Sequence, residues 1–418
     1  MHKTSNDTPL ALEGGRPEIS TPAPPLTGRW GAEERKCLDA MLKQDSLFYW
    51  NGPQTKLLTE RFRQHYPLTH VMPCSSGTAA IHIAVACTGI KPGEEVIVPP
   101  ITDMGTVIGI LYQQAVPVFA DLEPSTYNLD PVDVRKRITP KTRAIIAVHL
   151  AGNPARLREL RKLADEHNLI LIEDCAQAWG AKLDGRPVGT FGHIACYSLN
   201  DFKHIGCGDG GLVASSDERF GPVLQKYGDK AYDRVNGTKT PEFLAPNYRI
   251  SEPQSAVGAA QMDRMVAITE RRHALGTRLG RQITDIPGIV PHEVAPEAFC
   301  TYWFYLLRLE EGAFSCDRTQ FAKALGAEGV LAGAGYIPMP LYQYEVFQNH
   351  NFFAGQWPIR DAGLTTMDYR TVSCPNAEAT LKSCVYLRIH QGLDDAYVDG
   401  VARALRKVAG YYGLPLER

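Results

Sequence analysis

Short apolar runs alternate with charged, helix-like stretches between about residues 70 and 220 of the chain. The runs are brief and rich in branched or apolar residues, and they span residues 95–99, 116–120, 144–150, 169–172, 193–199 and 211–215. A charged stretch at 155–167 is typical of a surface helix. Short buried strands separated by helices indicate an α/β fold, in which helices cover both faces of a mostly parallel sheet.

The pattern changes beyond about residue 255, where longer amphipathic segments predominate. One long helix is expected at 254–275, with further helices at 317–325 and 396–412 and strands at 302–309 and 385–390. These elements predict a smaller C-terminal α+β domain, attached through the long helix. We therefore expect an N-terminal arm and first helix at 1–54, a large domain at 55–270 and a small domain at 271–418.

Composition and charge exclude several classes of protein. Hydrophobic residues make up 44% and charged residues 22%, and 44 Lys+Arg face 46 Asp+Glu, so no basic field favours nucleic acid. No apolar run reaches the roughly 18 residues of a membrane span, and the N-terminus lacks a signal-peptide core. We expect a cytoplasmic protein whose ten cysteines are reduced thiols and which holds no metal.

Residues 74–80 read Cys-Ser-Ser-Gly-Thr-Ala-Ala and open a predicted helix. The first turn of a helix has unpaired N–H groups and a positive partial charge, which suit a phosphate. A plain Ser or Thr helix cap is the alternative interpretation.

Asp174 stands just after the apolar run at 169–172, at the predicted end of a strand. Ligands of open parallel sheets bind outside the carboxyl ends of the strands. A carboxylate there could keep a cationic ring nitrogen protonated, whereas a turn residue is the plainer alternative.

Lys203 follows the predicted strand at 193–199 and precedes a glycine-rich loop at 206–211. The loop matches G-x-G-x-x-G, but it precedes a strand and opens no helix, so we expect no dinucleotide site. A lysine buried in a pocket can lose its proton and form a Schiff base. A solvated surface charge is the alternative.

Together these features resemble the DegT/DnrJ/EryC1/StrS family of pyridoxal phosphate (PLP)-dependent sugar and cyclitol aminotransferases. The order is a phosphate-binding helix start, a strand-end Asp and then a Lys about thirty residues later. The similarity covers roughly residues 10–410 and includes SSGTAAIHIA, GEEVIVPP, IEDCAQAWGA, YSLNDFKHIGCGDGG and NYRISEPQSAVGAAQM. YRTVSCPNAE and YIPMPLY look most like the branch of cyclitol aminotransferases and aminohydroxybenzoate synthase. The resemblance implies fold type I, with a large PLP-binding domain and a smaller C-terminal domain.

The resemblance implies roles for three residues that would contact the cofactor ring. Lys203 matches the lysine that forms the internal aldimine and moves the proton between Cα and C4′. Asp174 matches the carboxylate that pairs with the pyridine nitrogen. Gln177 matches the residue that hydrogen-bonds the ring 3-oxygen.

Other matching residues would bind the cofactor phosphate. Gly77, Thr78 and Ser198 match the phosphate binders of the same chain. Asn247 matches an asparagine that reaches the phosphate in the neighbouring subunit, so the resemblance implies a homodimer with shared active sites.

Asp103 departs from the family pattern, because it stands where an aromatic residue stacks on the cofactor ring. It could accept hydrogen bonds from substrate or raise the pKa of the imine. Alternatively it turns outward while Met104 or another side chain covers the ring. Tyr336, Tyr342 and Arg388 are further candidates on the substrate side.

We expect an aminotransferase that moves an amino group from glutamine or glutamate to a keto group of a sugar nucleotide, cyclitol or related ring. Such reactions belong to secondary-metabolite or cell-surface sugar biosynthesis. One alternative is a PLP enzyme that dehydrates or aromatises a cyclic ketone, as Asp103 suggests. Another is a non-catalytic regulatory homologue, which the retained Lys203, Asp174 and Gln177 disfavour.

Overall fold

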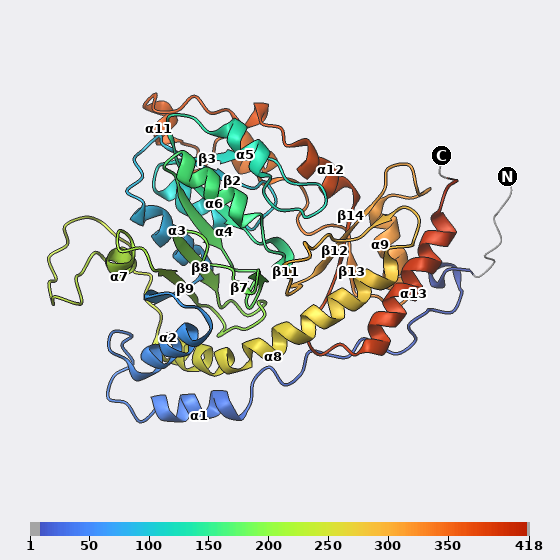
Figure 1. Ribbon diagram of the computed structural model, residues 1–418, viewed down its shortest axis with the longest axis horizontal. Helices are drawn as coiled ribbons and strands as arrows, with labels where there is room; N and C mark the ends of the chain where they lie inside the picture. Colours follow the sequence, from blue (N-terminus) through green and yellow to red (C-terminus); the bar gives the residue numbers. More distant parts are fainter. Residues whose placement is uncertain (1–8, 416–418) are drawn as a thin grey trace.

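The computed structural model describes residues 9–415; residues 1–8 of the predicted arm and residues 416–418 lie outside the described part. A seven-stranded sheet with the order β1-β9-β8-β5-β4-β2-β3 forms its centre (Figure 1). The strands are β1 (His70–Cys74), β2 (Glu95–Val98), β3 (Val116–Phe119), β4 (Thr142–Val148), β5 (Ile170–Asp174), β8 (Ile194–Ser198) and β9 (Gly211–Ser215). Strands from β3 to β8 pair in parallel, while β9 pairs antiparallel with both β8 and β1.

Helices cover this sheet, as the alternating pattern predicts. The helix α3 packs on β8 and β9, and α6 packs on β4 and β5. Every residue of α3 except Thr78 is buried, which explains its almost wholly apolar sequence. The helices of this region are α2 (Pro53–His65), α3 (Gly77–Cys87), α4 (Gly105–Tyr112), α5 (Pro131–Arg137), α6 (Leu157–Glu166) and α7 (Leu224–Gly228).

The helix α8 (Glu252–Ile283) runs from the large sheet to a smaller one (Figure 1). The backbone N–H of Ser251 donates to Gln254 Oε1 at 3.0 Å and so caps its start. The small sheet has the order β10-β12-β14-β13 and packs with α9 (Arg318–Ala327). Its strands are β10 (Ile289–Val290), β12 (Tyr305–Leu309), β13 (Ala332–Gly333) and β14 (Cys384–Leu387).

The other elements of residues 9–415 lie outside these two sheets. A third sheet joins β11 (Ala298–Phe299), β6 (Lys182–Leu183) and β7 (Arg186–Pro187). The remaining α-helices are α1 (Ala32–Met41), α10 (Glu345–Gln348), α11 (Pro358–Asp361), α12 (Pro375–Ser383) and α13 (Asp395–Tyr412). The 3-10 helices span Ala11–Glu13, Leu150–Gly152, Gly221–Val223, Leu341–Gln343 and Tyr369–Thr371.

Two main hydrophobic cores underlie the two sheets. The larger core contains the central sheet and its helices, and the smaller one contains α9, α13 and the second half of α8. Buried residues between Leu341 and Cys384 also belong to the larger core, so this late segment packs on the first sheet. The boundaries at 54/55 and 270/271 stay a prediction.

The expected α/β architecture and its mostly parallel sheet are confirmed, with small shifts at element ends. The strand expected at 302–309 begins only at Tyr305, because residues 301–303 hydrogen-bond to 151–152 instead of joining the small sheet. The long helix expected at 254–275 continues to Ile283. Among residues 9–415, no helix combines the length and the apolar character that a bilayer crossing requires.

Candidate active site

Asp174 ends β5 and is 4% exposed, so its carboxylate lies in a nearly dry environment at the carboxyl edge of the sheet. Its Oδ2 accepts a hydrogen bond from the Thr106 hydroxyl at 2.9 Å, and its Oδ1 accepts one from the Ala176 amide at 3.1 Å. Burial raises the pKa of Asp174, while these two bonds and the charge of Lys203 act in the opposite direction. Two hydrogen bonds therefore orient the carboxylate, but they do not fully compensate its negative charge.

Lys203 lies in the loop between β8 and β9, which hydrogen bonds hold in a compact shape. Its amide donates to the Asn200 carbonyl at 3.0 Å, and the Asp201 amide donates to Gly208 at 2.8 Å. Burial lowers the pKa of Lys203, and the charges of Asp174 and Asp103 oppose that shift. The structure thus brings this amine within electrostatic range of both carboxylates and favours its neutral, nucleophilic form.

Gln177 lies three residues beyond Asp174 and is held at both ends of its amide. Its Oε1 accepts from the Ala151 amide at 2.9 Å, and its Nε2 donates to the Tyr336 hydroxyl at 3.1 Å. Burial raises the pKa of Tyr336, and the charges of Asp103 and Asp174 raise it further. Tyr336 therefore belongs to the same cluster as the Asp and Lys.

The start of α3 faces the end of β8 and forms a cradle for an anion. Among the described residues, the Gly77 and Thr78 amides have no hydrogen-bond partner, while Ser76 Oγ accepts from the Ala79 amide at 3.0 Å. A Cβ added to Gly77 would lie 2.8 Å from Ser198 Cβ, so glycine permits this close approach. Two free amides at a helix start beside a serine hydroxyl fit a phosphate group.

Asp103 lies beside this cradle and is exposed. Its Oδ1 accepts a hydrogen bond from the Gly105 amide at 2.8 Å, which fixes the turn before α4. Met104 is half-buried and packs against the larger core. The aromatic ring that does lie against the Lys203 amine is that of Trp303, whose centroid is 3.9 Å from Nζ.

Asn247 is exposed and lies in a segment that pairs with the end of β1, the strand that precedes α3. The Ser75 amide donates to the carbonyl of Tyr248 at 2.8 Å. The residue next to Asn247 therefore contacts the segment just before α3. Asn247 itself forms an isolated bridge with Asp229.

The other two candidate residues on the substrate side lie in different surroundings. Tyr342 is 1% exposed, and its hydroxyl donates to Glu378 at 2.5 Å and accepts from the Cys374 amide at 3.0 Å. Its hydroxyl is thus used within the protein core. Arg388 is exposed at the end of the small sheet, where its amide donates to Leu331 at 2.9 Å.

The sequence interpretation missed three residues that hold the cluster together. Thr106 orients Asp174, Trp303 covers Lys203, and Arg29 of the N-terminal arm forms an ion pair with Asp201 at 3.2 Å. Each contact joins positions far apart in the chain, which no local pattern reveals. The aromatic run around Trp303 was a local sign that this segment packs in the interior, but it did not point to Lys203.

A buried group of His149, Glu173 and Cys175 also lies behind the site, with potential ligand atoms within 4.8 Å of one another. Hydrogen bonds account for its polar atoms: Glu173 accepts from the Gly189 amide at 2.6 Å and from His149 Nε2 at 3.2 Å. His149 Nδ1 accepts from the Ala155 amide at 3.1 Å. This group therefore supports the loop after β7.

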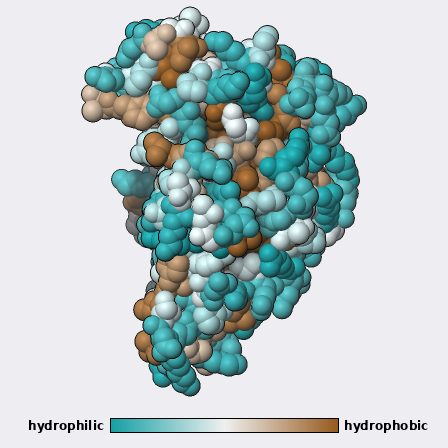
Figure 2. All heavy atoms as spheres, turned by 90° about the vertical axis from the view of Figure 1, so that its left-hand side faces the viewer, coloured by the Kyte–Doolittle hydropathy of each residue, from teal (hydrophilic) through white to brown (hydrophobic). Residues whose placement is uncertain are grey.

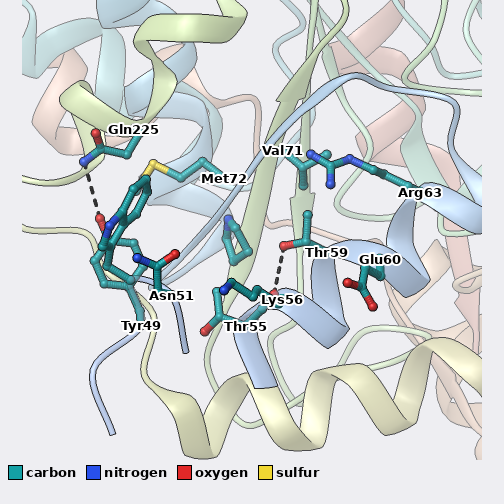
Figure 3. A pocket seen from close by; sticks show the side chains of 12 residues that line it. Tyr49, Asn51, Thr55, Lys56, Thr59, Glu60, Arg63, Val71, Met72 and Gln225 are labelled. Carbon is teal, nitrogen blue, oxygen red and sulfur yellow. Dashed lines mark hydrogen bonds between the residues drawn. The ribbon is translucent and has the colours of Figure 1, made fainter. Parts of the chain in front are cut away.

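A separate pocket of about 220 Å³ lies between α2, β1 and α7 (Figure 3). Tyr49 and Gln225 close one side, where Gln225 Nε2 donates to the Tyr49 hydroxyl at 3.4 Å, and Lys56 and Arg63 lie on α2. None of the candidate residues described above lines it.

Comparisons with known proteins show the family to which the chain belongs. The model of the DegT/DnrJ/EryC1/StrS aminotransferase family matches residues 29–406. The chain is 31% identical over 405 residues to GDP-perosamine synthase from Caulobacter vibrioides, covering 94% of this chain and 98% of the relative. It is 32% identical over 425 residues to L-glutamine:2-deoxy-scyllo-inosose aminotransferase from Micromonospora echinospora, covering 96% and 98%.

Solved structures show the same fold. The crystal structure of 3-amino-5-hydroxybenzoic acid synthase gives a TM-score of 0.82 at 25% identity, covering 94% of this chain and 100% of that one. NtdA from Bacillus subtilis, solved with its cofactor PMP bound, gives 0.80 at 22% identity, covering 94% and 86%. The fold is therefore that of fold-type-I PLP-dependent enzymes, and the cradle, the buried carboxylate and the half-buried amine fit PLP. The chain belongs to the DegT/DnrJ/EryC1/StrS family of PLP-dependent aminotransferases.

Proposed function

We propose that the enzyme takes an amino group from glutamine or glutamate and transfers it to a keto group on a sugar nucleotide, a cyclitol or a related ring. One observation carries the proposal: the half-buried amine of Lys203 lies in the field of a buried, oriented carboxylate, Asp174. The names of the relatives support the choice of substrates, because one uses glutamine and a cyclitol ketone and another makes a GDP-linked amino sugar. The ten free cysteines suit the reducing cytoplasm as its location.

PLP supplies an electron sink that stabilises negative charge at the Cα of the amino acid. Asp174 would hold the ring nitrogen protonated, and its burial strengthens that charge pair because the local dielectric constant is low. Lys203, biased toward the neutral amine, would accept the proton from Cα and deliver it to the cofactor carbon C4′. Gln177 Nε2 keeps a second hydrogen besides the one given to Tyr336, and it would donate that hydrogen to the ring 3-oxygen.

The phosphate would be bound where the helix α3 meets β8. The Gly77 and Thr78 amides would donate to it, and the dipole of an eleven-residue helix adds favourable potential. Ser198 Oγ accepts from the Asn200 amide at 3.2 Å, so its own hydrogen is available for a phosphate oxygen.

The proposed active unit is a homodimer in which Asn247 serves the partner's site. Exposed apolar residues surround the segment that carries it, among them Phe48 at 40%, Val235 at 75% and Leu244 at 97% exposure. Figure 2 faces the α7 side of the molecule and shows hydrophobic residues at several places on that surface. Such exposed apolar side chains are typical of a surface that a second subunit covers.

A complementation experiment tests the shared site. One subunit would carry Lys203→Ala and the other Asn247→Asp, with different tags so that the mixed dimer can be isolated. If Asn247 acts across the interface, the mixed dimer has one intact site and regains activity that neither parent has. Inactive mixed dimers would contradict the shared site while leaving the rest of the proposal intact.

The donor and the acceptor are tested separately. Absorbance of the PLP-loaded protein is followed while glutamine, glutamate or alanine is added without ketone, and we expect glutamine or glutamate to bleach it. Ketones of sugar nucleotides and cyclitols should then restore the spectrum, and the product is identified by mass. No response to any amino acid would overturn the proposal.

A second candidate, dehydration or aromatisation of a cyclic ketone, is favoured by the similarity to 3-amino-5-hydroxybenzoic acid synthase. The exposed Asp103 carboxylate, within electrostatic range of Lys203, is a second acid or base that such chemistry could use. A product mass that shows loss of water would select this reaction over simple amination.

A further inference from the structure

Trp303 contacts the lysine loop in two independent ways. The centroid of its indole ring lies 3.9 Å from Lys203 Nζ. Its indole N–H donates a hydrogen bond of 2.7 Å to the carbonyl of Phe202, the residue just before the lysine. One side chain thus holds both the amine and the backbone that carries it.

Trp303 is itself held firmly by the parts of the protein that meet at the site. Its amide donates to the Ala151 carbonyl at 2.9 Å, and its carbonyl accepts from Arg272 at 3.2 Å. Its ring meets the ring of Tyr336 edge-on, with centroids 6.0 Å apart. Because Arg272 is 4% exposed and also donates to Ile389, Trp303 sits on a rigid support.

The ring matters because position 103, whose charge also acts on Lys203, is an exposed aspartate. An aspartate offers no aromatic surface, whereas the indole face attracts the protonated form of the amine through its quadrupole and so opposes the lowering of the Lys203 pKa by burial. Trp303 therefore provides the aromatic surface at the point where the amine must be placed.

We propose that Trp303 is a positioning residue for Lys203: its ring face holds the amine, and its N–H fixes the lysine loop. The inference rests on the proposed function, in which this amine bonds PLP. It predicts that the electron density of the indole ring controls the protonation of Lys203 and that the N–H controls the opening of the loop.

Fluorinated tryptophans at position 303 test the ring contact with little change in the size of the ring. The pKa of Lys203 is measured in the protein without PLP, by competitive acylation at several pH values and mass analysis of the lysine peptide. Fluorination weakens the negative ring face, so the pKa of Lys203 should fall stepwise, by about half a unit to one and a half units over the series. An unchanged pKa across the series would overturn the proposal.

The variant Trp303→Phe tests the N–H, because it keeps an aromatic ring and removes the donor. Amide hydrogen exchange in the loop around Lys203 should accelerate several-fold, while Trp357→Phe, in the distant aromatic group with Phe352 and Tyr369, should leave the loop unchanged. If Trp303→Phe lowers only thermal stability and leaves loop exchange as in the wild type, Trp303 is a packing residue and the proposal is wrong.

The two proposals fail in distinguishable ways. Reduction of the PLP-loaded protein with borohydride, followed by peptide mass analysis, shows which lysine bonds the cofactor. PLP on another lysine would overturn the proposed function. If PLP bonds Lys203 but the pKa of Lys203 does not change with fluorination of Trp303, only the role of Trp303 is overturned.

Discussion

The hydroxyl of Thr106 donates a 2.9 Å hydrogen bond to Oδ2 of Asp174 and thereby ties α4 to the end of β5. The hydroxyl of Thr102 lies 2.7 Å from that of Thr106, so the contact continues into the loop before α4. With the Ala176 amide on the other oxygen, the carboxylate has a fixed direction before a ring nitrogen arrives. Such preorganisation lowers the cost of binding a cationic ring.

The variant Thr106→Val should weaken PLP binding about tenfold or more, because a hydrogen bond to a buried charged group is worth about 1.5–3 kcal/mol. Thr106→Ser should restore most of the affinity, since it returns the hydroxyl. Fluorescence titration of the apoprotein with PLP measures both constants. A valine variant with wild-type affinity would show that the bond does not orient Asp174.

Gly77→Ala should destabilise the start of α3 by about 1–3 kcal/mol and weaken PLP binding, because overpacking forces the backbone to shift. The new methyl would lie 2.8 Å from Ser198 Cβ. Gly326→Ala, in α9, is the matched control: nothing lies within 4 Å of its added Cβ. That control should be neutral or stabilising by up to about 1 kcal/mol. Equal effects of the two variants in denaturant unfolding would contradict the cradle.

Without PLP, Lys203→Met should be more stable than the wild type near neutral pH. Burial lowers the pKa of Lys203 in the folded protein below its ordinary 10.5. Burying the charged amine therefore costs stability below the folded pKa, and this cost disappears as pH rises from the folded pKa to 10.5. The advantage of the methionine variant should therefore shrink as pH rises toward 10.5. Thermal melts at several pH values measure it, and Lys162→Gln, on an exposed helix face, should show no such trend.

Arg29→Met should loosen the lysine loop from the side of the N-terminal arm. Arg29 pairs with Asp201 at 3.2 Å, and its carbonyl accepts from Gln261 at 2.7 Å, so the arm is attached to both the loop and α8. We expect faster amide exchange around Asp201 and a modest loss of PLP affinity. Arg219→Met, which removes a surface pair with Asp217, is the control. Identical exchange in both variants would rule out this role of the arm.

Local patterns predicted six of the seven strands of the central sheet, because each of the six is a short apolar run; β1, which begins at His70 and contains Pro73, was not predicted. They also placed Asp174 correctly, since the end of an apolar run marks the carboxyl edge of the sheet. Lys203 was found through its position after β8 and before the glycine-rich loop. These three features depend only on residues adjacent in sequence.

Contacts between distant segments were beyond such reasoning. Nothing near Trp303 in the sequence points to Lys203, because the contact arises only when residues 301–303 leave the small sheet to pair with 151–152. Tyr342 illustrates the reverse case: an aromatic residue near a promising motif turned out to donate its hydroxyl to Glu378 in the core. Tertiary packing decides both positions, and the local pattern does not encode it.

The most direct test of the central claim locates the cofactor bond and its response to donor in one measurement. The PLP-loaded protein is reduced with borohydride, with or without prior incubation with glutamine or glutamate, and the peptide carrying residue 203 is weighed. We predict a reduced PLP adduct on Lys203 that disappears after incubation with the donor. The donor's amino group then converts PLP to PMP, which forms no bond with the lysine. An adduct on another lysine, or one on Lys203 that no amino acid diminishes, would contradict the account.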